Sequence, residues 1–416
     1  MFTSSKSAIS RMSSVVISII IIVAAVAGGF YALTYLSSTS TTTTQSLTNV
    51  TFGFAGTADV TDTPGFMFWQ TFAQQVGLNL HVQYFDGDAS VAQALVSGSI
   101  QVAEGGFQST LLADQSQGNS SGSYPFLVFA NYESVNDYAL VVSNSIQSWS
   151  DLAGKPVATY GPGSSSELFC KVLEQQHGLS GNQINCAATG GGGTRIRALL
   201  ANQVVGDIAE PFDVVTAVST GKYHIIATIP QQLPNLLFSV LYTSKTYASA
   251  HPDVIAKMSQ AIMLSARWAQ NQTSWVAKEQ SAFPGTNSTV AATAWKIWIA
   301  MNIWNPNGGL SNDKVAFSEN FLINASVVKG FLDPKYWVDT SYQTQALASI
   351  GQYNGPPGGY PNPNLKTLNV TIPGFGAIFP SVGRGGTLDL AASPFVLHLE
   401  TATTSNLELF ARCACA

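Results

Sequence analysis

The hydrophobic pattern of the chain opens with an uncharged run from Val15 to Leu36, and Lys6 and Arg11 lie just before it. A helix needs roughly 20 apolar residues to cross a bilayer, and basic residues on the short flank favour an amino terminus that stays inside the cell. The run therefore predicts a single-pass transmembrane helix that anchors an extracellular domain. A cleaved secretory signal is the alternative, although its apolar stretch normally has about 7 to 15 residues.

The segment after the apolar run, Ser37 to Ser46, is almost purely Ser and Thr, which is typical of a solvated linker. Six N-x-S/T sequons follow it, at Asn49, Asn119, Asn271, Asn287, Asn324 and Asn369. Each sequon alone is a weak pattern, but their placement after the apolar run fits an exterior glycoprotein.

Between Asn49 and about Thr243, short apolar runs alternate with stretches of helical periodicity, which indicates βα units and a mainly parallel sheet. The first set has strands at Val50–Ala55, Leu80–Phe85 and Ile100–Ala103, and helices at Gly65–Val76 and Ser90–Ser97. A second set has strands at Pro156–Tyr160, Ile184–Ala188 and Asp207–Ala209, and helices at Ser165–Gln176 and Thr194–Asn202. Strand-like stretches at Asp137–Ser143 and Leu236–Thr243 predict two crossovers between two lobes.

Helical periodicity dominates the next part of the chain. The predicted helices are His251–Ala269, Ser274–Ala282, Thr289–Ile303 and Lys314–Phe331. Five tryptophans recur near helical spacing, and they predict packing of helices on a lobe rather than a stack for a ligand: Trp268, Trp275, Trp295, Trp298 and Trp304. A Gly- and Pro-rich stretch from Gln352 to Pro363 is typical of a linker.

The predicted domain boundaries follow from these patterns. They are 1–36 for the cytoplasmic start and the anchor or signal, 37–48 for the linker, 49–142 for the first part of lobe I, 143–235 for lobe II, 236–345 for the return to lobe I and the C-terminal helices, and 346–416 for a linker and an unassigned tail.

The composition argues against a nucleic-acid-binding protein. Charged residues make up 10% of the 416 residues and the net charge is -5, whereas a typical domain has about 25% charged residues. The chain lacks the basic runs from which a nucleic-acid surface is built. The scarcity of charge predicts an acidic medium, such as that around an archaeal cell surface, because carboxylates with pKa values of ~4 are unreliable partners there.

Six segments carry a family resemblance: Phe66–Val82, Gly87–Ser90, Ala94–Gly98, Ile146–Ala158, Pro162–Ser165 and His251–Val254. They are similar to the substrate-binding proteins of ABC importers for nitrate, sulfonates, taurine and thiamine-pyrimidine precursors. The resemblance covers roughly Asn49 to Asn271 and continues more loosely to Phe331. Two departures are Gln101, where the family often has Asp, and the lack of a lipid-attachment Cys near the amino terminus.

The resemblance implies an α/β, bilobal periplasmic-binding-protein (Venus-flytrap) fold, with two parallel-rich sheets flanked by helices and two interlobe crossovers. The lobes of such a fold close on a ligand by a hinge motion. It also implies a small-molecule solute, an ABC permease and its ATPase subunit as partners, and no cofactor.

Ligands of open α/β sheets bind at the carboxyl ends of the strands, and this rule places candidate ligand-binding residues in the loops that follow the predicted strands. The candidates are Thr57, Asp59, Gly105, Gly106, Phe107, Gln108, Gly163, Ser164, Ser165, Arg195 and Glu210. Small residues before a helix let an anionic group approach free backbone N–H groups, and Phe107 would stack on a flat ligand. Together with Arg195 and Glu210, Glu104 and Asp213 are among the few charges near the predicted cleft.

Each candidate also has a purely structural interpretation. Ser164 or Ser165 would then only cap a helix, Arg195 would form an ion pair, and Glu210 would hold a structural partner. The stretch from Gly105 to Thr110 would be no more than the amino terminus of a helix.

The sequence offers little that is typical of catalysis. The G-x-S-x-G match at Gly118–Gly122 lies in a polar stretch without the strand-turn-helix context of serine hydrolases. The five histidines show no metal-ligand spacing, and no P-loop motif is present. Cys170 and Cys186 predict a disulfide, with two buried free thiols as the alternative.

The leading hypothesis is a surface-anchored, non-enzymatic binding protein that delivers a small anionic or zwitterionic solute, similar to a sulfonate, nitrate or taurine, to an ABC importer. The alternatives are an enzyme on the same fold, of the pyrimidine-precursor-synthesis or dehydratase type, and a surface sensor or structural protein.

Overall fold

The computed structural model describes residues 46–56, 58–117, 124–179, 183–233 and 235–355, and its strands form two five-stranded sheets. Lobe I is built on the order β2-β1-β3-β10-β4 and lobe II on the order β7-β6-β8-β5-β9. The strands of lobe I are β1 (Thr48–Ala55), β2 (Leu78–Phe85), β3 (Val102–Gly106), β4 (Phe126–Glu133) and β10 (Ser239–Ser244). Those of lobe II are β5 (Ala139–Ser143), β6 (Pro156–Thr159), β7 (Asn185–Ala188), β8 (Gly206–Ala209) and β9 (Tyr223–Thr228).

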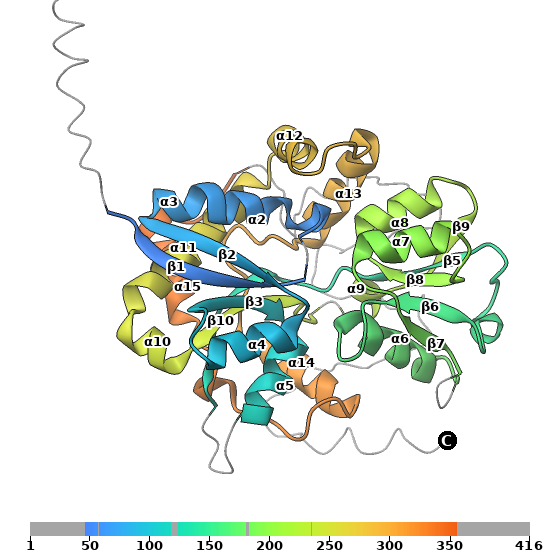
Figure 1. The fold of residues 1–416 in the computed structure, drawn as a ribbon, viewed down its shortest axis with the longest axis horizontal. Helices are drawn as coiled ribbons and strands as arrows, with labels where there is room; N and C mark the ends of the chain where they lie inside the picture. The colour runs from blue at the N-terminus through green and yellow to red at the C-terminus, as the bar shows by residue number, and fades with distance from the viewer. Residues whose placement is uncertain (1–45, 57, 118–123, 180–182, 234, 356–416) are drawn as a thin grey trace, which may run out of the picture. The chain divides into compact units, whose positions relative to one another are not determined.

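Helices cover both sheets (Figure 1). The first group runs from η1 (Val60–Asp62) through α2 (Thr63–Met67), the π-helical η2 (Phe68–Phe72), α3 (Ala73–Gln75), α4 (Asp88–Val96) and α5 (Phe107–Gln117). Lobe II contributes η3 (Trp149–Leu152), α6 (Ser165–Gln176), α7 (Gly192–Leu200), α8 (Pro211–Val218) and α9 (Ile229–Gln232). The last group is α10 (Lys245–Ala250), α11 (Pro252–Trp268), α12 (Gln272–Ala282), α13 (Ser288–Met301), α14 (Asn312–Asn324), η4 (Pro334–Tyr336) and α15 (Ser341–Ile350).

The βα alternation predicted from the sequence is confirmed, and each sheet is mixed rather than purely parallel. In lobe I, β1 pairs in parallel with β2 and β3, while β10 runs antiparallel to β3 and β4. In lobe II, β6 pairs in parallel with β7 and β8, while β5 runs antiparallel to β8 and β9. The reversed strands are those that enter each lobe from the other one.

The two crossovers are shorter than the stretches predicted for them. Residues 134–138 connect β4 to β5, and residues 233–238 connect α9 to β10. Asn136 donates its backbone N–H to the carbonyl of Leu236 at 3.0 Å, so the crossovers lie side by side. Because β5 already belongs to the second sheet, lobe II begins at Ala139, before the boundary at 142/143 that the sequence predicted.

Several predicted elements differ from the observed ones. β4 was not predicted, because its residues are almost all buried and give no alternation of polar and apolar positions. The stretch from Gly105 to Thr110, which the sequence left open between a ligand-binding turn and the amino terminus of a helix, is the end of β3 followed directly by α5. The last predicted long helix ends at Asn324 rather than Phe331, because Ser326 adopts a φ of 58° that interrupts the helix.

The tryptophans pack as the helical spacing predicts. Trp275, Trp298 and Trp304 are buried with ring centroids 5.4 to 5.9 Å apart, and Trp268 and Trp295 are partly buried against the same cluster. The indole N–H of Trp298 donates to Oδ2 of Asp137 at 2.6 Å, which ties the C-terminal helices to the first crossover.

The disulfide between Cys170 and Cys186 is present and joins α6 to β7, with a Cα–Cα distance of 6.0 Å. The predicted transmembrane run lies outside the described residues, as do Cys413 and Cys415. Among the helices of the described ranges, none has the length and apolarity required to span a bilayer.

Candidate functional site

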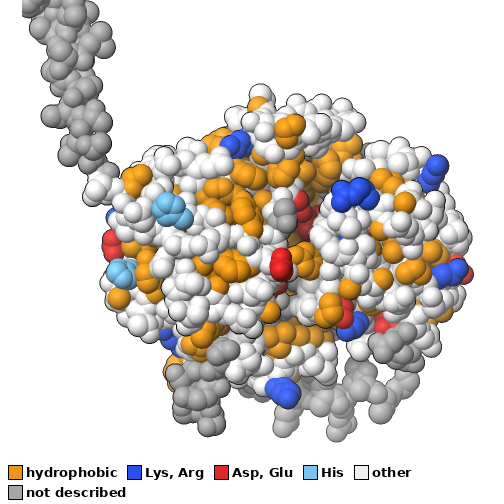
Figure 2. Space-filling model, in the orientation of Figure 1, with side chains coloured by type: hydrophobic (Ala, Val, Ile, Leu, Met, Phe, Trp, Pro, Cys, Tyr) orange, Lys and Arg blue, Asp and Glu red, His pale blue; other side chains and the backbone are white. Residues whose placement is uncertain are grey.

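The main cavity lies between the two lobes and is lined by both. The space between them, including its opening to solvent, measures about 820 Å³. Because this volume includes solvent at the opening, the space enclosed by the two lobes is smaller, and only a small solute would fit in it. Figure 2 shows acidic side chains gathered in the hollow at the centre of this face.

The lining of the cavity is strongly acidic. Within the described part of the chain it includes six carboxylates and one guanidinium. The carboxylates are Asp59, Asp62, Asp88, Glu104, Glu133 and Glu210, and the guanidinium belongs to Arg195.

The strand directions explain why these carboxylates meet. Glu104 lies on β3 and Glu133 ends β4, and these strands are parallel because both pair antiparallel with β10. Asp59 and Asp62 belong to the turn after β1, and Asp88 begins the helix after β2. The carboxyl ends of parallel strands meet at one edge of a sheet, and this edge of lobe I faces the cavity.

Asp59 and Asp62 hold each other in a reciprocal cap at the start of η1. The Asp59 backbone N–H donates to Oδ2 of Asp62 at 2.9 Å, and the Thr61 N–H donates to Oδ1 of Asp59 at 2.9 Å. The Tyr132 hydroxyl donates to Oδ1 of Asp62 at 3.0 Å. Burial and the nearby charge of Glu210 raise the pKa of Asp62 to about 7, although these hydrogen bonds oppose the change.

Glu104 and Asp88 each accept a backbone N–H. The Ala55 N–H donates to Oε2 of Glu104 at 3.4 Å, and the Gly106 N–H donates to Oδ1 of Asp88 at 2.8 Å. Burial raises the pKa of both carboxyls, and for Glu104 the charges of Asp88 and Asp62 raise it further.

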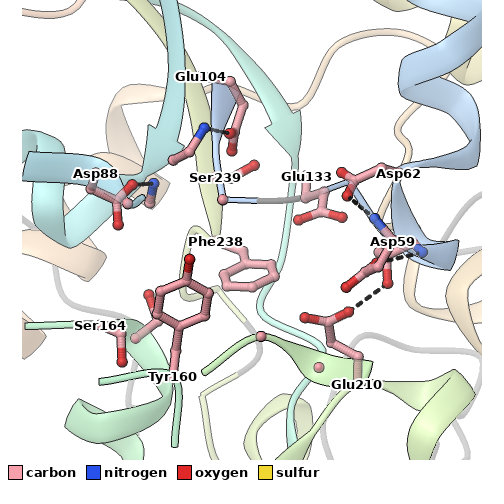
Figure 3. A pocket seen from close by; sticks show the side chains of 18 of the residues that line it. Asp59, Asp62, Asp88, Glu104, Glu133, Tyr160, Ser164, Glu210, Phe238 and Ser239 are labelled. Atoms are coloured by element: carbon pink, nitrogen blue, oxygen red, sulfur yellow. Dashed lines mark hydrogen bonds between the residues drawn. The ribbon is translucent and has the colours of Figure 1, made fainter. Parts of the chain in front are cut away.

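Glu133 differs from these carboxylates because it accepts no hydrogen bond from the part of the chain that the structure describes. Its side chain is buried, with the residue 5% exposed, and lies beside the cavity (Figure 3). Burial raises the pKa of Glu133 well above the usual range, and the charges of Asp137 and Asp62 add to this effect.

Lobe II contributes the guanidinium of Arg195, whose Nε and Nη1 are engaged and whose Nη2 has no hydrogen-bond partner among the described residues. Its Nε donates to Oδ1 of Asp207 at 3.1 Å, and its Nη1 donates to the carbonyl of Gly190 at 3.1 Å. Arg195 is 1% exposed and Asp207 is 0% exposed, so the pair is a buried ion pair. Burial, with the charges of Asp207 and Glu210, raises the pKa of the neighbouring Asp213 to about 8.

Hydrogen bonds join the lobes on both sides of the cavity. The Thr61 hydroxyl donates to Oε2 of Glu210 at 2.6 Å. Nε2 of Gln108 donates to the carbonyl of Gly163 at 2.7 Å. These contacts join the two lobes across the space between them.

The structure brings some of the sequence-predicted site residues to the cavity and leaves others outside it. Asp59, Gly106, Ser164, Ser165, Arg195 and Glu210 line the cavity. Gly105, Phe107, Gln108 and Gly163 are absent from the described lining, and Thr57 lies outside the described residues.

The residues outside the lining have other contacts. Phe107 is buried and packs on Trp337 with ring centroids 5.6 Å apart, so it lies in the lobe I core rather than against a ligand. Gln108 and Gly163 bond to each other across the lobes. At Gly105 an added Cβ would lie 2.8 Å from Oδ1 of Asp88, so this glycine lets the carboxylate approach β3.

Several residues of the cavity were not predicted. They are Phe54, Asp62, Asp88, Glu133, Tyr138, Tyr160, Phe238 and Ser239. The rule that ligands bind at the carboxyl ends of the strands would have identified Glu133 if β4 had been recognised as a strand. The same rule would have identified Asp88 if the turn after β2 had been considered.

Figure 3 shows how these groups surround the cavity. Glu104, Glu133 and Asp62 lie on the lobe I side, Glu210 faces them from lobe II, and the rings of Phe238 and Tyr160 border the space between them. The residues that the structure describes contain no group of three or more His, Cys, Asp or Glu side chains arranged to hold a metal ion. The Gly118–Gly122 motif lies outside those residues.

Four sequons lie on described residues, at Asn49, Asn271, Asn287 and Asn324, and all four are exposed. Glycosylation at them stays a prediction. Asn119 and Asn369 lie outside the described residues.

Comparison with known proteins gives a match to one family model and shows the fold. The family model described as "NMT1/THI5 like" matches residues 68–273. No curated protein matches the sequence.

Solved structures share the fold at low sequence identity. A protein from Bordetella bronchiseptica RB50 has a TM-score of 0.62 and 21% identity, over 73% of this chain and 98% of that one. The periplasmic nitrate-binding protein of Synechocystis PCC 6803 has a TM-score of 0.59 and 12% identity, over 73% and 89%. The alkanesulfonate-binding protein of Xanthomonas axonopodis pv. citri, solved with MOPS, has a TM-score of 0.53 and 17% identity, over 70% and 98%. The fold is therefore that of the periplasmic binding proteins, as the sequence resemblance predicts.

Proposed function

The chain carries an NMT1/THI5-like domain on a periplasmic-binding-protein fold, and from this premise we propose that it is a solute-binding protein of an ABC importer. It captures a small molecule in the cleft between its lobes and presents it to the permease. The observation that carries the proposal is the cavity between the lobes, whose lining residues come from both of them.

Closure of the two lobes supplies the capture step. The contacts from Thr61 to Glu210 and from Gln108 to Gly163 join the lobes beside the cavity, so they form only when the lobes approach each other. A solute that touches both lobes adds to these contacts and favours the closed arrangement. The names of the similar structures, a nitrate-binding and an alkanesulfonate-binding protein, support a role in uptake.

We infer that the site binds the solute without converting it chemically. Arg195 is paired with Asp207, and the cavity is lined by carboxyls, hydroxyls and aromatic rings whose hydrogen bonds position them for recognition. The proposal is therefore a binding protein rather than an enzyme, and turnover of a bound solute by the purified chain would contradict it.

The proposed location is the outer face of the cell membrane, with the run from Val15 to Leu36 as the anchor. The disulfide between Cys170 and Cys186 supports an oxidising compartment. Protease treatment of intact cells tests this location: degradation of the domain without lysis is expected, and protection of the domain until lysis would contradict it.

Ligand-dependent thermal stabilisation tests the proposed function. The full-length chain in mild detergent is heated with nitrate, sulfonates, taurine, pyrimidines, amines and neutral alcohols. At a concentration 100 times its Kd, a true ligand stabilises the folded chain by about 2.7 kcal/mol. A folded sample that no class of small solute stabilises contradicts the proposed function.

A further inference from the structure

The charge of the cavity bears on the class of solute. Six carboxylates line it, and its one described guanidinium, that of Arg195, is held by Asp207 within the wall of lobe II. An anionic solute would meet six acidic side chains, and the one described lining guanidinium would offer it only Nη2, because Nε and Nη1 are already engaged. The sequence-based expectation of a sulfonate or nitrate is therefore not favoured by the cavity itself.

Glu133 is an independent indication that this cavity binds a hydrogen-bond donor. It is 5% exposed, it lines the cavity, and it accepts no hydrogen bond from the described residues. A buried carboxylate without a partner is costly, and the great majority of buried polar groups have one. A donor in the cavity would satisfy Glu133, and Figure 3 shows its carboxylate beside that space.

The neighbouring carboxylates are held in place for the same ligand. Asp62, Asp88 and Glu104 each accept at least one backbone N–H, so their orientation is fixed before a ligand arrives. Carboxylates fixed in this way bind a positive group with little loss of side-chain freedom.

Aromatic rings complete the site. Phe238 and Tyr160 border the same space as Glu133 (Figure 3), and they come from the second crossover and from the turn after β6. A ring face attracts a cation and also accepts the apolar body of a ligand.

A metal ion fits this arrangement less well than an organic cation. Within the described ranges, no three acidic, His or Cys side chains converge on one point. The carboxylates are distributed around the cavity, on β3, β4, η1, α4 and the start of α8. Such a distribution fits an organic ligand that has several N–H donors, rather than a single ion.

We propose that the cleft binds an organic cation, with an ammonium or guanidinium group at the carboxylate of Glu133 and an apolar or ring-bearing part against Phe238 and Tyr160. The proposal deepens the proposed function and rests on it, since it names the solute class of the same cleft.

Matched probes test the proposal on the full-length chain in mild detergent at pH 8. Phenethylamine and agmatine supply an ammonium and a guanidinium, and 2-phenylethanol and 2-phenylethanesulfonate are neutral and anionic counterparts of phenethylamine. Isothermal titration is expected to give at least about 10-fold tighter binding of an amine than of its counterparts, because a hydrogen bond to a charged group contributes about 1.5 to 3 kcal/mol.

Two variants locate the effect. Glu133→Gln is expected to weaken binding of the amine by about 10- to 100-fold, because one charge-assisted contact is lost. Glu104→Gln tests the carboxylate that β3 contributes to the lobe I side of the cavity. Glu174→Gln is the matched control, because Glu174 is also buried but accepts the Ile184 N–H at 3.0 Å away from the cavity lining.

The outcomes separate the two proposals. Tighter binding of the sulfonate or of nitrate than of the amines would overturn the organic cation and leave a solute-binding protein in place. Equal binding of the amine by wild type, Glu133→Gln and Glu104→Gln would overturn the assignment of the carboxylates. Failure of every probe, together with every compound of the thermal panel, would contradict the proposed function itself.

Discussion

The pH dependence of stability is expected to follow from the buried carboxyls of the cleft, and Asp62 allows a specific test. Asp62 is 9% exposed, and burial together with Glu210 raises its pKa from 3.8 to about 7. The folded chain therefore keeps this proton in a pH range where the unfolded chain has already released it. The contribution of Asp62 to the free energy of unfolding is highest below pH ~4 and is lost as the pH rises to about 7.

The magnitude follows from the two pKa values. A difference of about 3 between the folded and unfolded states corresponds to about 4 kcal/mol, because each pH unit contributes about 1.36 kcal/mol. Asp62→Asn removes the ionisation while it keeps the shape of the protonated carboxyl. The amide oxygen accepts the Asp59 N–H, and the amide N–H₂ donates to the Tyr132 hydroxyl, so both contacts survive.

The assay is urea unfolding at pH 3, 5 and 8, followed by the fluorescence of the buried tryptophans Trp275, Trp298 and Trp304. Wild type and Asp62→Asn are expected to unfold at similar urea concentrations at pH 3. At pH 8 the variant is expected to be more stable by up to about 4 kcal/mol. Asp253→Asn, which changes an exposed carboxylate paired with Lys257, is the matched control and is expected to differ little at either pH.

Two results would refute the reasoning. The first is a variant that is less stable than wild type at pH 8, because that would mean that the ionised Asp62 is well satisfied by its surroundings. The second is the same stability difference at pH 3 and pH 8, because that would mean that Asp62 does not titrate between them. The charged and titratable groups that face Asp62 are Asp59, Glu210, Glu104, Glu133, Tyr132 and Tyr84.

Three further predictions concern the disulfide, the buried tryptophan cluster and a hydrogen bond across the cleft. Replacing Cys170 and Cys186 by Ser is expected to lower the free energy of unfolding by roughly 3 kcal/mol, measured by urea unfolding, because a closed loop with a sequence separation of 16 is opened; an unchanged midpoint would argue against this. Trp298→Phe leaves Asp137 without its indole donor and is expected to cost about 1 to 3 kcal/mol in the same assay. Gln108→Ala removes a hydrogen bond across the cleft and is expected to raise the Kd of whichever ligand stabilises wild type about 5- to 10-fold by isothermal titration, and an unchanged Kd would mean that this contact does not assist closure.

Local patterns in the sequence were sufficient to predict much of the fold. The helix Ser165–Gln176 was predicted with the bounds that the structure gives it, because Ser164 caps its start and an apolar stripe follows. The strands β1, β2, β6 and β7 were found because each apolar run ends at a turn. The strand β4 was missed because its residues are buried on both faces, which leaves no alternation to recognise.

The site was harder to predict than the fold, because it depends on contacts between residues far apart in the sequence. Glu104 and Glu210 were recognised as charges near the cleft, but Glu133 depends on β4 and Phe238 depends on the second crossover. Arg195 illustrates the same difficulty. The sequence left open whether it contacts a ligand or forms an ion pair, and only the fold shows that Asp207 engages it.

The most direct measurement is a crystal structure of the full-length chain with phenethylamine in the cleft. The ammonium nitrogen is expected to lie about 3 Å from the carboxylate of Glu133, with the ring against Phe238 or Tyr160. An empty cleft at a saturating concentration, or an ammonium group that points away from the carboxylates, would contradict this proposal.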